Sequence, residues 1–311
     1  MGTPEFAVKS LRALVESGYR VVGVITMPDK PVGKHQSVLQ ASPVKEYALS
    51  QNLPLLQPEK LKDHDFIEQL KDWKADLQIV VAFRMLPEIV WNMPPLGTFN
   101  LHASLLPQYR GAAPINWAII NGEKETGVTT FFLTHEIDTG KIIFQERIPI
   151  KDTDNAGIIH DQLMKIGASL VLKTVEAIVN NEIRPVEQKT ITVNEELLKP
   201  APKIFKETCL IDWHKTTKEI YDFIRGLSPY PTAWTELKTS QGETLTLKIF
   251  EAEKILKQHD LIAGSIVTDG KTQLDIAASD GFIRIKNLQQ AGKKRMLVED
   301  FLRGNARGFL K

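Results

Sequence analysis

The sequence predicts an α/β protein with a doubly wound, mostly parallel sheet, followed by a small β-barrel of the OB type. Three observations support this prediction. The first half alternates apolar, strand-like runs with amphipathic helical stretches, as a parallel sheet with crossover helices does. The length of 311 residues is sufficient for about two domains. Beyond residue 202, short strand-like runs follow one another closely with turn residues between them, as in a small barrel.

The elements of the first half follow from the hydrophobic period. Residues 6–17 place their apolar side chains on one helical face, and residues 77–83 are apolar throughout, which is typical of a strand buried on both faces. Strands are expected at residues 20–26, 77–83, 98–102 and 128–134, and helices at 6–17, 43–52, 65–75, 113–122 and 157–181.

The start of the chain conflicts with this pattern. A doubly wound sheet usually opens with a central strand, but the chain begins at a glycine turn, "MGTPEF". One interpretation is a sheet built differently. The interpretation favoured here is that the sequence lacks its true start.

The second half predicts a connector and a separate domain. A polar, proline-containing stretch at 183–202 reads as a linker between a first domain at 1–182 and a second at 203–311. The second domain is expected to hold a helix at 217–226. Its strands are expected within 243–254, 264–270, 272–279 and 281–289.

Composition restricts the class of protein. Hydrophobic residues make up 42% of the chain, and no apolar run is long enough to span a membrane. The single cysteine, Cys209, excludes an intramolecular disulfide and is expected to be a packing residue. Together with the absence of a secretory pattern at the start, this predicts a cytoplasmic protein without a membrane partner. The net charge is +1, with 18 Lys and Arg against 14 Asp and Glu in residues 201–311. This mild excess is weak support for a nucleic-acid partner.

Two polar residues in an apolar strand point to chemistry. In "FNLHASLLPQYRGAAP", Asn100 and His102 are two residues apart and share one strand face. At the carboxyl end of a strand, where open α/β sheets bind ligands, an amide and an imidazole can both reach one carbonyl oxygen. Each donor aimed at a developing oxyanion contributes about 3 kcal/mol in comparable enzymes. The competing interpretation is that His102 is a hydrogen-bonded structural residue, which is common for a lone histidine in a strand.

A carboxylate completes the set required for acyl transfer. Asp138 lies in the turn "DTG" after the strand at 128–134, and parallel neighbouring strands would bring it against Asn100 and His102. It would then either orient His102 or take the proton lost by an attacking amine, and the sequence leaves both roles open. An aspartic protease needs two such turns, and only one is found.

The sequence speaks against several other chemistries. It contains no G-x-S-x-G, no P-loop and no G-x-G-x-x-G after a strand, and its seven histidines do not show zinc spacing. A glycosidase pair of carboxylates is not excluded by spacing, but nothing points to one. No metal is therefore expected.

Several segments together resemble the methionyl-tRNA formyltransferases over nearly the whole chain. These segments are "MGTPEFA", "FNLHASLLPQYRGAAPINWAIINGEKETGVT", "DTG", "PAPKI", "IDW", "IRGLSPYPTAW" and "GKKRMLVEDFLRG". The central block is typical of folate-dependent formyltransferases in general, and the C-terminal segments favour the tRNA-acting kind. The resemblance implies a formyltransferase-like Rossmann variant at 1–182 and a tRNA-binding barrel at 203–311.

The resemblance also implies a reaction and its residues. The formyl group of 10-formyltetrahydrofolate would pass to the α-amino group of methionyl initiator tRNA, with Asn100, His102 and Asp138 as the catalytic set. The segment Ser104, Leu105, Leu106 and Pro107 would line the folate site, where its apolar turn forms a rigid wall for a flat ligand.

The tRNA would meet basic side chains in two places. The expected contacts are Lys34, in the loop after the second strand, and Lys293, Lys294 and Arg295 on the barrel. A monomer is expected. Three alternatives stay open at this point: a formyltransferase acting on a small amine, a hydrolase of the formyl donor, and a non-catalytic RNA-binding protein on the same scaffold.

Overall fold

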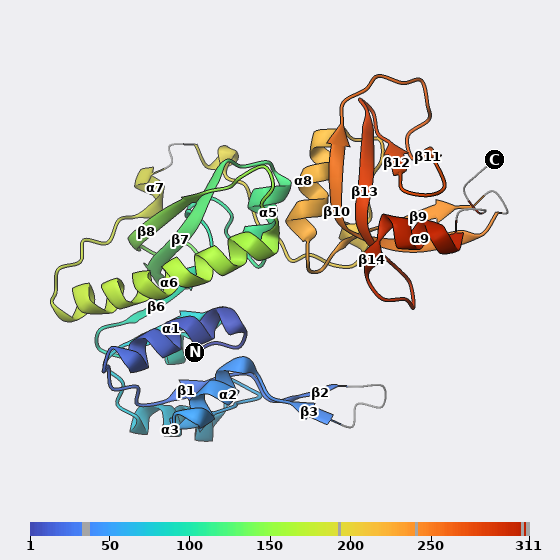
Figure 1. Ribbon diagram of the computed structural model, residues 1–311. Coiled ribbons are helices and arrows are strands. Elements are labelled where there is room, and N and C mark those ends of the chain that lie inside the picture. Colours follow the sequence, from blue (N-terminus) through green and yellow to red (C-terminus); the bar gives the residue numbers. More distant parts are fainter. Residues whose placement is uncertain (33–37, 192–193, 240–241, 306–307, 309–311) are drawn as a thin grey trace. The chain divides into compact units, whose positions relative to one another are not determined.

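The computed structural model (Figure 1) describes residues 1–32, 38–191, 194–239, 242–305 and 308. The chain forms two compact units, and each is described by itself. Unit 1 consists of Met1–Gly111, Thr126–Ile148 and His160–Pro200, and unit 2 of Ala112–Glu125, Pro149–Ile159 and Ala201–Lys311.

The strands of unit 1 confirm the predicted α/β class. They are β1 (Val24–Ile25), β2 (Lys30–Val32), β3 (Val38–Gln40), β4 (Leu55–Leu56), β5 (Gln78–Val81), β6 (Thr98–His102), β7 (Glu125–Phe132) and β8 (Ile142–Pro149). A four-stranded sheet has the order β5-β6-β7-β8, β1 pairs with β4, and β2 pairs with β3. The pairs β1–β4 and β5–β6 are parallel, as predicted, whereas β6 and β7 are antiparallel.

Helices alternate with these strands. They are α1 (Glu5–Glu16), α2 (Pro43–Ser50), α3 (His64–Asp72), α4 (Glu88–Trp91), α6 (Ala156–Val179), α7 (Gln188–Ile191) and the 3₁₀ turn η1 (Glu195–Leu197). Helices α2 and α3 begin at side-chain caps: Ser42 Oγ accepts from Lys45 N at 3.1 Å, and Asp63 Oδ1 accepts from Phe66 N at 3.2 Å. None of the helices in the described residues has the length and apolar character to cross a membrane.

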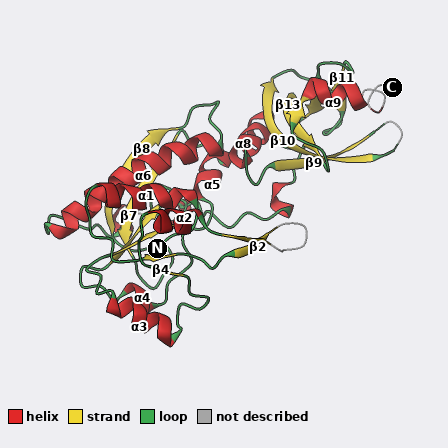
Figure 2. Cartoon of the chain, turned by 60° about the horizontal axis from the view of Figure 1, so that its bottom comes forward, coloured by secondary structure: helices red, strands yellow, loops and turns green. Residues whose placement is uncertain are grey.

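Helix α6 and helix α1 lie side by side (Figures 1 and 2). Between them, the rings of Phe6 and His160 meet edge to face with their centroids 5.3 Å apart. Helix α6 also fixes the strand that carries the site. A side chain on Gly167 would come within 2.8 Å of Leu101 Cδ2, so the glycine gives Leu101 room against the helix. The apolar face of β6 is thereby buried, and its polar face is left for the site.

The start of the chain joins β1 and β5. Gly2 forms a parallel bridge with Val81, and its N–H donates to the carbonyl of Ile25 at 3.0 Å. Of the strand expected at residues 20–26, only Val24 and Ile25 form a regular strand, β1.

Unit 2 is built around one curled antiparallel sheet. Its elements are α5 (Pro114–Ile120), the 3₁₀ turn η2 (Glu207–Cys209), α8 (Thr217–Leu227), β9 (Ala233–Lys238), β10 (Thr244–Ile255), β11 (Ile266–Thr268), β12 (Leu274–Ala277), β13 (Phe282–Gln290), β14 (Met296–Leu297) and α9 (Val298–Asn305). The order is β11-β12-β13-β10-β9, with β14 on β13. Register shifts in β10 between Ile249 and Ala252 bend the sheet into half a barrel, consistent with the OB-type prediction. Cys209 is buried in the core of this unit, as predicted.

Helix α8 carries a buried ion pair. Asp222 Oδ1 accepts from Arg225 Nε at 2.7 Å, and both side chains are almost fully buried. The same guanidinium donates to the carbonyl of Asp154 at 2.9 Å, and the other carboxylate oxygen accepts from Lys218 Nζ at 2.6 Å. Because the partners satisfy one another, removing either leaves a buried charge unpaired.

We expect Asp222→Asn to lower the free energy of unfolding of unit 2 by about 3 kcal/mol, since it leaves the Arg225 guanidinium uncompensated. Urea unfolding followed by tryptophan fluorescence measures this loss. The matched control is Asp300→Asn. Asp300 and Arg303 are also three residues apart in a helix, with an N–O distance of 2.9 Å, but their side chains are solvent-exposed. The Asp300→Asn variant should lose no more than about 0.5 kcal/mol of unfolding free energy. Equal losses in both variants would contradict the interpretation.

Candidate active site

Strand β6 presents an amide and an imidazole on one face. Asn100 and His102 are two residues apart in this regular strand, while Phe99 and Leu101 are buried on the opposite face. His102 is only 6% exposed. The buried Oδ1 atom of Asn100 has no hydrogen-bond partner among the described residues. A buried polar atom without a partner is costly in a folded protein, and this one is on the same strand face as the imidazole.

The imidazole of His102 is held in one orientation. Its Nε2 atom lies 2.9 Å from the carbonyl oxygen of Tyr109. Because a carbonyl only accepts, Nε2 carries the hydrogen and donates it. The other ring nitrogen, Nδ1, lies 3.8 Å from Asp138 Oδ2. That separation is longer than a hydrogen bond and short enough for a carboxylate to stabilise a charge on the ring.

Tyr109 has an unusual backbone that serves this contact. Its φ of 60° lies in the left-handed region, which costs about 1 kcal/mol for a residue with a side chain. The conformation is held because the Tyr109 N–H donates to the carbonyl of Lys199 at 2.7 Å and the side chain is buried. The turn after β6 therefore places a carbonyl where His102 needs an acceptor.

Asp138 reaches His102 by a route that the sequence prediction had wrong. Parallel strand ends were expected to bring these residues together, but β6 and β7 are antiparallel, so their carboxyl ends point in opposite directions. The loop after β7 turns back instead. Asp138 has a φ of 56°, and its Oδ2 atom accepts from the Gly111 N–H at 2.9 Å. A Cβ atom on Gly140 would lie 1.7 Å from the carbonyl oxygen of Phe132, so only glycine permits this return.

Gln188 ties the two loops of the site together, and the sequence analysis did not single it out. Its Nε2 atom donates to the carbonyls of Asp138 and Gly140, both at 2.8 Å. Its Oε1 atom accepts from Arg110 Nε at 3.0 Å and from a terminal nitrogen of the same guanidinium at 2.6 Å. Gln188 is 2% exposed although it lies in the stretch predicted as a linker. No local pattern distinguishes it from the polar residues around it.

The segment predicted to line the folate site is mostly buried within its own turn. Ser104 Oγ donates to the carbonyl of Gln108 at 2.7 Å, and Leu106 packs against Phe131 and Ile142. Pro107 is also buried, which leaves Leu105 as the partly exposed member. Within this segment, Leu105 is thus the side chain best placed to meet a ligand directly.

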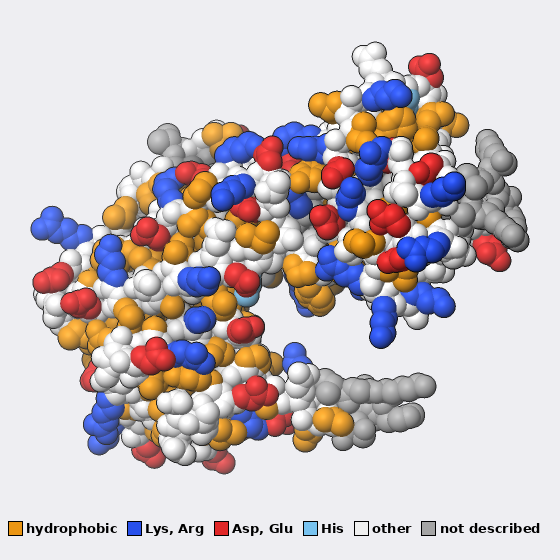
Figure 3. All heavy atoms as spheres, viewed as in Figure 1, with side chains coloured by type: hydrophobic (Ala, Val, Ile, Leu, Met, Phe, Trp, Pro, Cys, Tyr) orange, Lys and Arg blue, Asp and Glu red, His pale blue; other side chains and the backbone are white. Residues whose placement is uncertain are grey.

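The basic residues predicted to meet tRNA are placed unequally. Lys34 lies outside the described residues. Lys293, Lys294 and Arg295 are exposed in the connection between β13 and β14. The Arg295 guanidinium stacks over the Phe250 ring at 4.4 Å and its Nε donates to Asn287 Oδ1. On the face shown in Figure 3, side chains of both charge signs are interspersed.

Comparison with known proteins identifies the family. Residues 1–175 match the formyl transferase family, and residues 203–306 match the formyl transferase C-terminal domain. A methionyl-tRNA formyltransferase of Phocaeicola vulgatus is 68% identical over 98% of this chain and 94% of its own length. That of Bacteroides thetaiotaomicron is 65% identical with the same coverage. The chain belongs to the methionyl-tRNA formyltransferase family. It is accordingly a formyl-group transferase, as the sequence resemblance predicted.

Solved structures share the fold at low identity. An N-formyltransferase from Helicobacter canadensis, in complex with folinic acid and dTDP-3-aminofucose, superposes with a TM-score of 0.63 at 21% identity, covering 95% of this chain and 97% of that one. HypX from Aquifex aeolicus, in complex with tetrahydrofolic acid, gives 0.59 at 21% identity, with 84% and 44% coverage. The chain thus shares its fold with both of these proteins. Within the described residues, no group of three or more His, Cys, Asp or Glu is arranged to hold a metal ion.

We expect Gln188→Leu to lower the kcat of formyl transfer at least about tenfold, since small displacements of catalytic groups have effects of this size. The change removes all four hydrogen bonds that join the Asp138 loop to Arg110. Hydrogen exchange of the Gly140 amide should become faster in parallel. The matched control is Gln69→Leu, because Gln69 is an exposed helical residue that donates to Asp65 O in its own helix. Wild-type kcat in Gln188→Leu would show that Asp138 is positioned without it.

Proposed function

We propose that the protein transfers the formyl group of 10-formyltetrahydrofolate to the α-amino group of methionyl initiator tRNA. The observation that carries this proposal is the approach of His102 Nδ1 to Asp138 Oδ2 at 3.8 Å, beside Asn100 on the same strand face. This set suits direct attack of a neutral amine on a formyl carbon, because it combines donors for an oxyanion with a carboxylate for the proton.

The three side chains divide the work. The amine nitrogen attacks the formyl carbon, and the carbonyl oxygen gains charge as the carbon becomes tetrahedral. The Asn100 amide donates to that oxygen, and the His102 ring donates from Nδ1 in its doubly protonated form, since Nε2 already carries the hydrogen given to Tyr109. The Tyr109 carbonyl keeps the ring from turning, since it already accepts from Nε2.

Asp138 handles the proton. The attacking amine loses one proton, and the folate nitrogen gains one when its bond to the formyl carbon breaks. Asp138 Oδ2 accepts from the Gly111 N–H and faces His102 Nδ1. The carboxylate is therefore positioned to orient the imidazole and to receive the amine proton.

The substrates are proposed from the family and the residues together. Folates are bound by HypX and by the Helicobacter canadensis enzyme, which share this fold, and the Ser104–Pro107 turn is the proposed folate contact. Residues 1–182 are assigned to catalysis, 183–202 to the linker and 203–311 to tRNA binding. Lys34 and the exposed residues Lys293, Lys294 and Arg295 are the proposed phosphate contacts.

The main rival is a formyltransferase for a small amine, because a structural neighbour holds an amino sugar nucleotide. The assay that separates the two offers purified protein 10-formyltetrahydrofolate with one acceptor at a time. The acceptors are methionyl initiator tRNA, methionyl elongator tRNA, free methionine and an amino sugar nucleotide. Formylation of the initiator species alone is expected, and preference for the sugar would overturn the proposal.

We expect His102→Ala and Asp138→Asn each to lower kcat about 10²-fold or more, with folate binding retained. Isothermal titration with tetrahydrofolate measures the retained binding. His64→Ala and Asp65→Asn are the matched controls, since this His–Asp pair lies at 3.6 Å but is almost fully exposed. Normal turnover in either active-site variant would show that the substituted residue takes no part in the reaction.

We expect Lys294→Ala to raise the KM for tRNA and to reduce the salt dependence of log(kcat/KM) by roughly one phosphate contact, a slope change of about 0.7–0.9. The kcat should not change, because the lysine is outside the catalytic set. Lys271→Ala, another exposed lysine of unit 2, is the control. An unchanged KM in Lys294→Ala would show that this lysine does not contact tRNA.

A further inference from the structure

The turn Ser104–Pro107, which is the proposed folate contact, is held by a side chain of the neighbouring strand β7. Thr129 of β7 pairs with His102 of β6, so its side chain lies on the same sheet face as the imidazole. Thr129 is fully buried, and its hydroxyl donates to the Ser104 carbonyl at 2.6 Å. The same oxygen accepts from the Leu106 N–H at 3.2 Å. One hydroxyl thus holds both a carbonyl and an amide of the turn.

Gln145 of β8 completes the contacts of this hydroxyl. Its Nε2 atom donates to Thr129 Oγ1 at 3.0 Å and to the Leu106 carbonyl at 2.7 Å. A hydroxyl has one hydrogen and two lone pairs, and an amide nitrogen of glutamine has two hydrogens. The hydroxyl of Thr129 and the amide nitrogen of Gln145 are therefore both fully used, and they form one connected support for the turn.

Gly127 provides the apolar part of this support. A Cβ atom on Gly127 would lie 2.5 Å from Leu105 Cδ2 and 2.1 Å from the Glu146 carbonyl oxygen, so a larger residue does not fit there. The glycine lets Leu105 pack directly on β7. Because Leu105 is the partly exposed side chain of the turn, this packing sets how the turn presents it to a ligand.

The next residue of β7 offers an internal comparison. Thr130 is also fully buried, but it pairs with Leu101 and so lies on the opposite face of the sheet. Its hydroxyl lies 2.9 Å from the hydroxyl of Thr174 in α6. Two adjacent threonines of one strand thus make buried hydrogen bonds of different purpose. Thr130 joins the sheet to a helix, and Thr129 holds the turn beside the imidazole.

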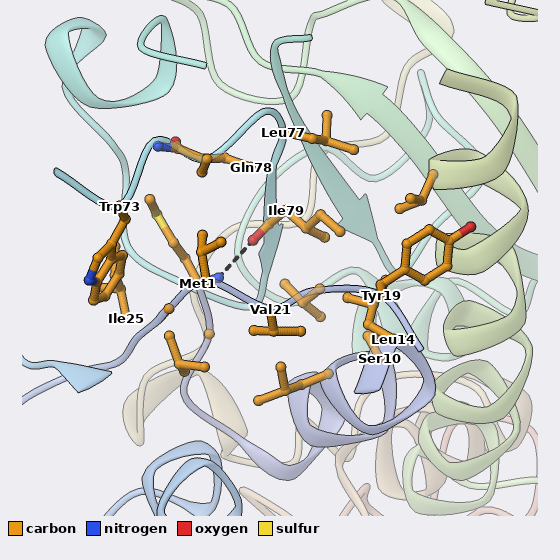
Figure 4. Close-up of a pocket in the computed structure, with 18 of the residues that line it drawn as sticks. Met1, Ser10, Leu14, Tyr19, Val21, Ile25, Trp73, Leu77, Gln78 and Ile79 are labelled. Carbon is orange, nitrogen blue, oxygen red and sulfur yellow. Dashed lines mark hydrogen bonds between the residues drawn. The ribbon is translucent and has the colours of Figure 1, made fainter. Parts of the chain in front are cut away.

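The support is separate from the apolar cavity of about 310 Å³ shown in Figure 4. That cavity is lined by residues of α1, β1 and β5, among them Leu14, Ile25 and Ile79. The described residues that line it include neither Thr129 nor Gln145. Any effect of these two residues on a ligand is therefore expected to pass through the turn that they contact.

We propose that Thr129 and Gln145 are positioning residues that fix the turn Ser104–Pro107 for folate binding. The inference rests on the proposed function, in which this turn is the folate contact. Three of the four hydrogen bonds described go to main-chain atoms of the turn, so the support fixes its backbone. A wall that is ordered before the ligand arrives removes an ordering cost from binding.

The test measures folate binding by full-length variants. We expect Thr129→Val to raise the Kd for tetrahydrofolate about tenfold in isothermal titration, with a parallel rise in the KM for 10-formyltetrahydrofolate, because the turn loses its hydroxyl partner. The KM for methionyl initiator tRNA should stay unchanged. Thr129→Ser keeps the hydroxyl and should retain the wild-type Kd. Gln145→Leu, at a half-buried residue, should raise the Kd in the same direction without altering the core.

The matched control is Thr130→Val, the same substitution at the adjacent buried position. It should lower the Tm about as much as Thr129→Val does, while leaving the Kd for tetrahydrofolate within about twofold of the wild type. Hydrogen exchange of the Leu106 amide should become faster in Thr129→Val alone, since that amide donates to the Thr129 hydroxyl. A merely structural role would change the Tm without this separation.

Three outcomes would overturn the inference while the wild type binds tetrahydrofolate. They are a wild-type Kd in both Thr129→Val and Gln145→Leu, an equal rise in Thr129→Val and Thr130→Val, and an equal rise in the Val and Ser variants of Thr129. A wild type that binds no tetrahydrofolate would instead overturn the proposed function, and this inference with it. The two failures are therefore distinguishable.

Discussion

The hydrogen bond from His102 Nε2 to the Tyr109 carbonyl is the contact on which the arrangement of the site depends. It fixes the ring through Nε2, and in that orientation Nδ1 lies 3.8 Å from Asp138 Oδ2. The acceptor exists only because Tyr109 adopts a left-handed backbone held by Lys199. The His102 imidazole is thus oriented by main-chain geometry, and the residue with the left-handed backbone lies in the turn directly after the strand.

The site is assembled from segments far apart in the sequence, and Gln188 is the link between them. It joins the carbonyls of the Asp138 loop to the guanidinium of Arg110, which belongs to the turn after β6. Buried hydrogen-bond networks of this kind are strong when every member is satisfied. The stretch around Gln188, which was predicted as a linker, belongs to unit 1 and holds the Asp138 loop there.

The sheets of unit 1 place the catalytic face and the cavity at different strands. Strand β6 carries the candidate residues Asn100 and His102, and its apolar face packs on α6 through Leu101 and Gly167. Among the described residues, Met1 and Gly2 connect β1 and β5, and β5 in turn pairs with β6.

The α/β class, the polar face of β6 and the buried state of Cys209 could all be predicted from the sequence, because each depends on local periodicity or residue type. Asn100 and His102 share a face since they are two residues apart in a strand. The direction of β7, the return of the loop to Asp138 and the role of Gln188 could not be predicted. Strand direction depends on which edge is free, and a side-chain amide 48 residues from Gly140 bonds to it only after the chain has folded. Local composition thus determined which residues can do chemistry, and tertiary structure decided which of them meet, because hydrogen bonds between distant segments depend on the path of the whole chain.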